Sequence, residues 1–512
     1  MRTMNARYDI APITRSLTEK AVPPLLLALL GEFDREKISY CYWKSSRRVP
    51  AVLNGESDVD LLVAREDQHG AQAILLARGF KHFPPVTGQD HPAISSFLGY
   101  DERSGRLIHV HFHVHLIVGE RLLKNYRVPW EHIVLARAVL HPTLPIRILD
   151  PASEAILLVV RACLELRRLD PMTLRGWQAT TRKFELDRRD LVARVDRTTL
   201  RNAAAELLSE ELAEPVADAF YSGQALERQT GLSRRIRRHF AADRTYNAFE
   251  ARMRSAGRAV LWVAGHFNKS LLHAPRPWNR RAPGGGRVIA IMGIDGSGKS
   301  SSVAAMRAWL GSEIDVVPIY FGTGDGRPSL VLRPFKLMVP LITRMLRSKP
   351  KPKGASHGKV SGRAPGLLYS VLLMVWAAAV ALDKRKKLIA ARRGASRGLI
   401  VFADRFPQDQ ILGFNDGPLM ARLTAAPHWL RRFEAAVYAL AHRLPPDLVI
   451  KLVVTPETVA KREPDMNPAI IRERIAALPR LEFAGARVVS IDAERPQADV
   501  IRAIKHEIWS VL

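Results

Sequence analysis

The sequence is poor in cysteine and carries no sign of an internal repeat. Cys41 and Cys163 are the only cysteines in 512 residues, too few for a disulfide framework or a cysteine-built zinc cluster, and this count is typical of a protein of the reducing cytosol. No self-similarity occurs at the periods of solenoid proteins. The apolar patch near the N-terminus is interrupted by Pro23 and Pro24 and is followed by no small-residue cleavage site. We therefore interpret it as mature sequence and not as a signal peptide.

Long apolar runs are also scarce. The clearest one extends from Leu367 to Leu382 and is followed at once by the basic segment DKRKK. It falls short of the roughly 18 to 20 residues that a membrane-spanning helix needs. We expect a buried core helix here, with a membrane segment as the alternative.

Acidic residues are outnumbered by basic ones. The chain has 78 lysines and arginines against 50 aspartates and glutamates, a formal net charge of +28. Such a surface attracts polyanions: nucleic acid, anionic lipid or phosphorylated substrates. The segment 233–272 is both basic and amphipathic, which indicates either a solvated helix face or contact with nucleic acid or an anionic membrane. The chain has no basic motif interleaved with aromatic residues, as single-strand-binding proteins have.

Composition and hydrophobic periodicity divide the chain into four parts. Residues 1–149 alternate helix-like and strand-like pieces, as expected for a small α/β or α+β domain. From Asp150 the pattern becomes helical, with Pro151 in a first turn, and remains helical to 272. Residues 273–286 mix proline, glycine and arginine like an interdomain linker. Residues 287–512 form the last part, with a flexible basic loop near 347–366.

The stretch GIDGSGKSS predicts a phosphate-binding loop. Gly293, Gly298, Lys299 and Ser300 satisfy the pattern G-x-x-x-x-G-K-[ST] between the strand-like RVIAIM and the helix-like VAAMRAWL. Glycines let backbone N–H groups converge on a phosphate, Lys299 reaches the β and γ oxygens of ATP, and Ser300 ligates Mg²⁺. The nucleotide-binding residues predicted from the loop are Gly293, Gly296, Ser297, Gly298, Lys299, Ser300 and Ser301. The alternative is a glycine turn that only precedes a helix.

A second polar pair follows another apolar run, GLIVFA. Asp404 is expected to bind in the coordination shell of Mg²⁺ or to contact the acceptor hydroxyl. Arg405 is expected to bind an acceptor phosphate through two hydrogen bonds. The alternative is that both residues only cap a strand and pair locally.

These segments resemble thymidylate kinases and related nucleoside monophosphate kinases. GIDGSGKSS, VFADRF, PPDLVIKLVVTPETVAKR and VVSIDAERPQADVIRAIKHEIW occur in the order of that family, and the resemblance covers residues 286–512. It implies a five-stranded parallel sheet flanked by helices, ATP and Mg²⁺ as cofactors, and a homodimer, since relatives are commonly dimeric.

The resemblance also implies roles for individual residues. Asp295 is expected near the sugar and reacting phosphate of the acceptor, and Arg405 on the acceptor phosphate. Segment 461–474 is expected to form a lid over the ATP phosphates or adenine, through Arg462, Arg472 or Arg474. The chain departs from the family in a long insertion between YFGTGDG and GLIVFADRF, where the acceptor pocket is shaped. Thymidine monophosphate is therefore only the default acceptor.

The N-terminal part carries a D-x-D pair. Asp58 and Asp60 alternate along a predicted strand, so both carboxylates face one side and can ligate a divalent metal. With the preceding Ser45 and Ser46, the pair resembles the nucleotidyltransferase superfamily over residues 36–116. Lys44 stands where that family usually has glycine.

The third acid of the nucleotidyltransferase pattern is missing. The corresponding strand, LIHVHFHVH, offers His109, His111, His113 and His115 at alternate positions. These histidines could complete a metal site with Asp58 and Asp60, His111 first among them. Active metal-dependent transfer, a domain that only binds ligand, and an unrelated fold with a polar strand face all remain open.

The sequence thus predicts an α/β protein with a C-terminal P-loop kinase domain and an N-terminal nucleotidyltransferase-like α+β domain with a helical extension. The expected activity is ATP- and Mg²⁺-dependent phosphoryl transfer to a nucleoside monophosphate in the cytoplasm. Two alternatives fit the basic charge: a membrane-peripheral kinase acting on a polysaccharide or lipid-linked precursor, and a nucleic-acid end-processing kinase.

Overall fold

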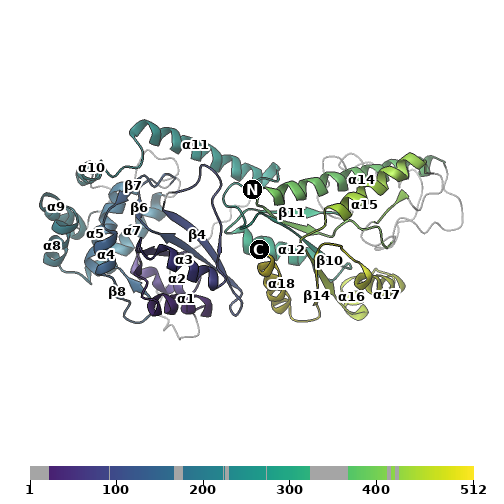
Figure 1. The fold of residues 1–512 in the computed structure, drawn as a ribbon, viewed down its shortest axis with the longest axis horizontal. Helices are drawn as coiled ribbons and strands as arrows, with labels where there is room; N and C mark the ends of the chain where they lie inside the picture. The colour runs from purple at the N-terminus through teal and green to yellow at the C-terminus, as the bar shows by residue number, and fades with distance from the viewer. Residues whose placement is uncertain are drawn as a thin grey trace. The chain divides into compact units, whose positions relative to one another are not determined.

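The chain forms two compact units, each with its own sheet (Figure 1). The computed structural model describes residues 22–91, 93–120, 122–165, 177–222, 224, 230–272, 274–322, 367–411, 417–420 and 426–512. Among these, unit 1 takes the residues up to Lys81 together with His91–Arg252, and unit 2 takes His82–Asp90 together with Met253–Leu512. The basic loop predicted near 347–366 lies outside the described residues.

The division between the units differs from the predicted linker at 273–286. It falls after Arg252, inside the helix α11 (Ala248–Phe267). Residues 82–90 join unit 2 because their backbone pairs with the segment after α11: Val86 N–H donates to the Asn279 carbonyl at 2.9 Å. Arg258 of α11 donates to the Gly88 carbonyl at 3.0 Å. A composition change in the sequence does not reveal such pairing, because its partners are distant in the chain.

Unit 1 is built on a mixed sheet of seven strands in the order β3-β4-β5-β2-β1-β9-β8. A second sheet pairs β6 with β7. The strands are β1 (Tyr40–Tyr42), β2 (Val59–Val63), β3 (Lys81–His82), β4 (Ile94–Asp101), β5 (Arg106–His113), β6 (Leu116–Val118), β7 (Tyr126–Val128), β8 (Val139–Leu140) and β9 (Arg147–Ile148). Strands β2 and β5 run parallel, with Asp60 opposite His111. This pairing brings the D-x-D segment beside the histidine-rich strand.

Helices cover both faces of the unit 1 sheet. Its helices are α1 (Pro24–Arg35), η2 (Ser46–Arg48), α2 (Val49–Leu53), α3 (Gln68–Ala77), α4 (Glu131–Ala136), α5 (Pro151–Glu165), α7 (Trp177–Val192), α8 (Arg197–Leu207), α9 (Glu210–Tyr221) and α10 (Thr230–His239). On β2, Leu61 packs in the apolar cluster of α1 and α3, whereas Leu62 packs in the cluster of α5 and the later helices. Since strand side chains alternate, Asp60 lies on the same face as Leu62.

Unit 2 contains the expected parallel sheet of five strands. Its order is β11-β12-β10-β13-β14, and every neighbouring pair is parallel. The strands are β10 (Arg287–Gly293), β11 (Val316–Tyr320), β12 (Ile400–Asp404), β13 (Leu448–Val453) and β14 (Arg487–Asp492). All five residues of β12 are buried, as expected for a strand covered on both faces.

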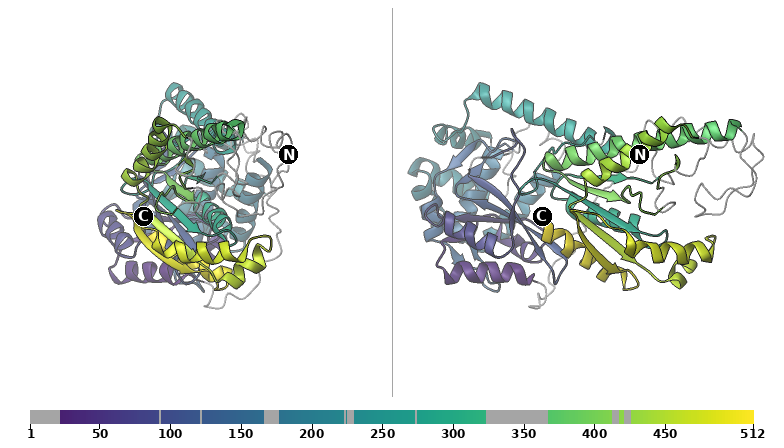
Figure 2. Two further views of the ribbon diagram at one scale, coloured as in Figure 1. Left: turned by 90° about the vertical axis from the view of Figure 1, so that its right-hand side faces the viewer. Right: turned by 45° about the vertical axis from the view of Figure 1, so that its right-hand side comes forward.

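The helices of unit 2 form two layers. They are α12 (Lys299–Gly311), α14 (Leu367–Ser396), α15 (His428–Arg443), α16 (Pro456–Arg462), α17 (Pro468–Ala477), η6 (Leu478–Arg480) and α18 (Gln497–Val511), and the short π-helix η4 (Asn268–Leu272) follows α11. Helices α14 and α15 lie side by side, and α12 packs with α18 (Figures 1 and 2).

The apolar run that begins at Leu367 forms the first half of α14. Ala377 and Val380 are buried, but Val371 and Val375 are 42% and 46% exposed, so the run is only partly a core helix as predicted. The second half of α14 packs through Ala391 and its neighbours on the sheet. Within the described residues, no helix is long and apolar enough to cross a membrane.

One buried acid makes the stability of unit 1 depend on pH. Glu154 lies in the first turn of α5, where its Oε1 accepts hydrogen bonds from the backbone N–H and the hydroxyl of Ser46 at 2.8 and 3.1 Å. Burial raises the pKa of Glu154 to about 7, although the Ser46 hydrogen bonds oppose the shift. The folded chain therefore keeps a proton that the unfolded chain loses near pH 4.5.

Because the unfolded chain loses this proton at a lower pH than the folded chain does, we expect the folded chain to become less stable as the pH rises. Between about pH 4.5 and 7 the free energy of unfolding should fall, by about 3 kcal/mol at most, and then level off. Glu154→Gln has no titrating proton and should remove this part of the slope. The measurement is denaturant unfolding of both proteins at several pH values from 5 to 8. Parallel stability curves for the two proteins would contradict the assignment.

Candidate functional site

The main candidate site lies at the carboxyl ends of the unit 2 strands. Gly293 ends β10, and the loop from Ile294 to Gly298 leads directly into α12. Gly298 is the N-cap residue of α12, with φ +90°, a conformation that glycine adopts without strain. In parallel α/β sheets, ligands bind at this edge, and a helix N-terminus attracts phosphate.

Lys299 and Ser300 open α12 and lie beside the loop. The Lys299 Nζ donates to the Ile294 carbonyl at 2.5 Å and is 3.6 Å from Asp295 Oδ1. Burial, together with the charge of Arg405, lowers the pKa of Lys299 to about 8. The Ser300 hydroxyl donates to Asp404 Oδ2 at 2.8 Å. The structure thus brings together the loop and the strand-end carboxylate that the sequence placed in one site.

Asp295 is surrounded by three cations. Its Oδ1 accepts from Arg405 Nη2 at 2.5 Å, and its Oδ2 from Arg474 Nη1 at 3.3 Å, in addition to the contact with Lys299. Burial alone would raise the pKa of this carboxyl, but the charges of Arg405, Lys299 and Arg474 outweigh it and lower the pKa. Lys299, Arg405 and Arg474 therefore share one internal anion.

The predicted lid segment consists of α16, a turn and α17. Arg462, the last residue of α16, donates from Nη1 to the Gly296 carbonyl at 2.9 Å, and Arg474 of α17 reaches Asp295. Arg472 lies on the same helix but is exposed. Two of the three arginines named from the sequence thus contact the loop between β10 and α12.

The residues of the loop line a cleft of about 1210 Å³. Its walls include Ser297, Ser301, Tyr320 and the apolar side chains Met466 and Val500. Tyr320 ends β11, and the Arg405 guanidinium lies 5.9 Å from the centre of its ring. Sequence reasoning missed Tyr320, although its position at the end of an apolar run was the available signal. The lining of the cleft thus combines cations, a helix N-terminus and apolar side chains.

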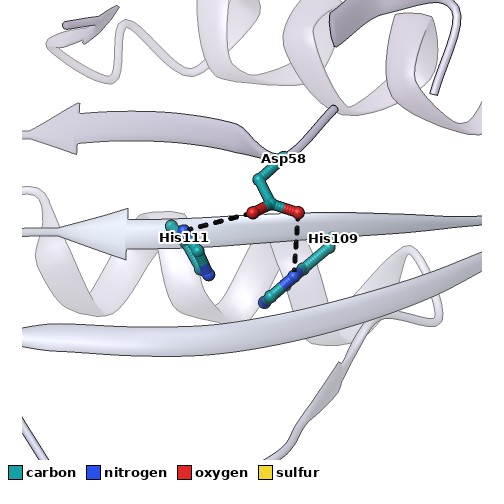
Figure 3. A group of neighbouring side chains, drawn as sticks. All are labelled: Asp58, His109 and His111. Atoms are coloured by element: carbon teal, nitrogen blue, oxygen red, sulfur yellow. Dashed lines mark ion pairs between the residues drawn. The ribbon is translucent and has the colours of Figure 1, made fainter. Parts of the chain in front are cut away.

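A second cluster lies on the unit 1 sheet, where three histidines of β5 meet the D-x-D pair. His109 Nδ1 lies 3.1 Å from Asp58 Oδ1, and His111 Nδ1 lies 3.9 Å from Asp58 Oδ2 (Figure 3). His111 Nδ1 is also 3.2 Å from Asp60 Oδ1, and His113 Nε2 is 3.5 Å from the same oxygen. The predicted meeting of the aspartates with His111 is present.

The expectation that four histidines share this face is wrong for one of them. Strand β5 ends at His113, so the alternation stops before His115. The ring of His115 instead contacts Glu131 Oε1 at 3.1 Å.

Lys44 forms an ion pair with Asp60 Oδ1 at 2.8 Å. Burial would raise the pKa of Asp60, but the Lys44 charge and the hydrogen bonds of His111 and His113 lower it well below the usual range. Burial lowers the pKa of His113 to about 3, so its ring is neutral at physiological pH. Lys44 therefore neutralises the buried carboxylate.

Further cations lie near Lys44, and no sequence pattern marks them because they come from separate helices and loops. Burial lowers the pKa of Lys124 to about 8, with the charge of Lys44 adding to the shift. Burial likewise lowers the pKa of Lys183 to about 8, with a contribution from Arg161. The Arg161 guanidinium lies 5.6 Å from the ring centre of Trp43 and is paired with Glu165 at 2.9 Å.

Gly293 provides a test of the loop geometry. A Cβ at this position would lie 2.4 Å from Ser297 Oγ and 3.2 Å from the Leu452 carbonyl oxygen, so Gly293→Ala must displace the loop. We expect at least a tenfold weaker affinity for ATP and a loss of about 1–3 kcal/mol of stability. Gly257→Ala is the control, because its Cβ meets nothing within 4 Å. Titration calorimetry measures the affinity, and an unchanged value would contradict the loop's role.

Comparison with known proteins gives relatives but no matching family model. The chain is 31% identical over 230 residues to the uncharacterized ATP-binding protein YghS of Escherichia coli K12. The matched region is 44% of this chain and 94% of YghS. It is 26% identical over 232 residues to the uncharacterized ATP-binding protein YghR of Escherichia coli K12, and this matched region is 44% of this chain and 87% of YghR. YghR of Escherichia coli CFT073 matches to the same extent. By the identity with YghS and the share of its length that is matched, the chain belongs to the YghS family.

Proposed function

We propose that unit 2 binds ATP with Mg²⁺ and transfers the γ-phosphoryl group to a nucleotide-like acceptor phosphate, in the manner of thymidylate kinases. The observation that carries this proposal is the contact of Ser300 with Asp404 at the mouth of the glycine loop, with Lys299 beside it. A phosphate cradle, a metal-binding hydroxyl and a strand-end carboxylate are the parts that phosphoryl transfer by P-loop enzymes requires. YghS and YghR are both named ATP-binding proteins, which supports nucleotide binding by this chain without assigning it to one unit.

The residues present fit a magnesium ion. Asp404 Oδ1 is buried and accepts no hydrogen bond among the described residues, which leaves one carboxylate oxygen for a cation. Its Oδ2 already faces the Ser300 hydroxyl. Hard oxygen ligands of this kind suit Mg²⁺, which would neutralise charge on the phosphates of ATP. Ser300 and Asp404 would hold the ion directly or through water.

Asp295 and Arg405 support a phosphorylated acceptor. In the transfer, an oxygen of the acceptor phosphate forms a bond to the γ-phosphorus, and the bond to the β–γ bridging oxygen breaks, so that ADP leaves. The contribution expected from the protein is alignment and neutralisation of charge. Arg405 lies 5.9 Å from the ring centre of Tyr320 and donates to Asp295, and in this proposal it would bind the acceptor phosphate after leaving the carboxylate.

Lys299→Ala tests the activity. The chain is incubated with ATP, Mg²⁺ and each of a panel of nucleoside monophosphates, and ADP release is followed by a coupled assay. We expect one acceptor to stimulate ADP release above the rate with water alone, and Lys299→Ala to reduce that rate at least about 100-fold, because charge stabilisation of the transferred group is lost. Lys386→Ala, an exposed lysine of α14, is the matched control. If no acceptor exceeds water, or the variant retains the rate, the proposal fails.

Asp295→Asn tests the role of the internal anion. Without the carboxylate, Lys299, Arg405 and Arg474 lose the negative charge that competes with phosphate oxygens. We expect the affinity for inorganic pyrophosphate to rise several-fold. Titration calorimetry at low ionic strength measures it, with the exposed Asp492→Asn as control. An unchanged or weaker affinity would show that Asp295 does not compete with phosphate.

A further inference from the structure

We propose that unit 1 holds a divalent transition metal between Asp58, His109 and His111. This inference is independent of phosphoryl transfer by unit 2. The three side chains come from adjacent parallel strands, since Asp58 directly precedes β2 and both histidines lie on β5. One ligand atom from each lies within 4.8 Å of the other two.

The spacing of these atoms suits a first coordination shell. In a tetrahedral site with bonds of about 2.0–2.1 Å, ligand atoms lie roughly 3.4 Å apart. The separations here are 3.1 Å from Asp58 Oδ1 to His109 Nδ1 and 3.9 Å from Asp58 Oδ2 to His111 Nδ1. Both ring nitrogens are turned toward the carboxylate (Figure 3). Small rotations of the side chains would therefore place all three around one ion.

The alternative group of Asp60, His111 and His113 fits less well. Asp60 Oδ1 already contacts the Lys44 ammonium at 2.8 Å, which occupies the place that a cation would take. The side chains of Asp60 and His113 are 6% and 0% exposed, so this group is the more deeply buried of the two. The Asp58 side chain is 46% exposed, so the other group has an acid that solvent reaches.

The donor set selects a transition metal over magnesium. Two imidazoles and one carboxylate are typical ligands of Zn²⁺, Fe²⁺ and related ions, whereas Mg²⁺ prefers oxygen. Three protein ligands also leave a coordination position open for water or an anion, as in catalytic and not in purely structural zinc sites. The ladder with β2 fixes the backbone positions of both histidines, and the centres of their rings lie 4.1 Å apart.

The test is metal binding by the full chain. The protein is stripped with a chelator and titrated with Zn²⁺ and Mg²⁺ in competition with a chromophoric indicator, without nucleotide. We expect one Zn²⁺ site that Mg²⁺ does not fill. Since loss of an outer-shell partner alone costs roughly 10–100-fold in affinity, loss of a ligand in Asp58→Asn, His109→Ala or His111→Ala should weaken Zn²⁺ binding more than about 100-fold. The controls His115→Ala and Lys299→Ala should bind as the wild type does.

Equal Zn²⁺ affinity in the wild type and Asp58→Asn would overturn the proposal, whether or not Asp60→Asn loses binding. A measurement on the wild type guards against variants that fail to fold: Co²⁺ added to the stripped chain should give the visible absorption of a four- or five-coordinate site, and Zn²⁺ should abolish it. A spectrum identical to that of aqueous Co²⁺ would also overturn the proposal. If the chain binds no Zn²⁺ at this site, the proposal of phosphoryl transfer by unit 2 still stands, because the Lys299→Ala assay tests it separately.

Discussion

The parallel pairing of β10 with β12 is the constraint on which the candidate site of unit 2 depends. The register sets Ile291 opposite Asp404, so the loop after Gly293 and the end of β12 leave the sheet at the same edge. The whole of β12 is buried, and the strand lies between β11 and β10 in the sheet. The contact between Ser300 and Asp404 follows from this alignment, as does the position of Arg405 near Asp295.

In both units, cations that are buried or partly buried contact a single carboxylate. In unit 2, Asp295 binds Arg405, Arg474 and Lys299. In unit 1, Asp60 faces Lys44 and two imidazoles. Burying a charge without a partner is costly, so each carboxylate stabilises its neighbouring cations when no other anion is bound. In unit 2 this arrangement suits exchange with phosphate oxygens, whereas in unit 1 the neutralised Asp60 leaves Asp58 as the more accessible acid.

The local patterns of the sequence were reliable where one segment carried the whole signal. The apolar run before Gly293 became β10, the helix began at Lys299, and Pro151 opened α5. The resemblance to thymidylate kinases also anticipated the five-stranded parallel sheet. Patterns that depended on where an element ends were less reliable. The histidine alternation was extended to His115, but β5 ends at His113, and residues 82–90 joined unit 2 through pairing that no local signal marks.

The sequence by itself determined the chemical types in each site: a glycine loop with Lys299 and Ser300, a strand-end Asp404, and a D-x-D pair beside a run of histidines. Only the tertiary structure decided which of them meet. It turned Arg462 and Arg474 toward the loop and left Arg472 exposed, and it paired Asp60 with Lys44 while leaving Asp58 to His109 and His111. The physical reason is that spacing along a strand or helix fixes the face on which a side chain lies, whereas its partner is fixed by strand order and register, which involve residues far apart in the chain.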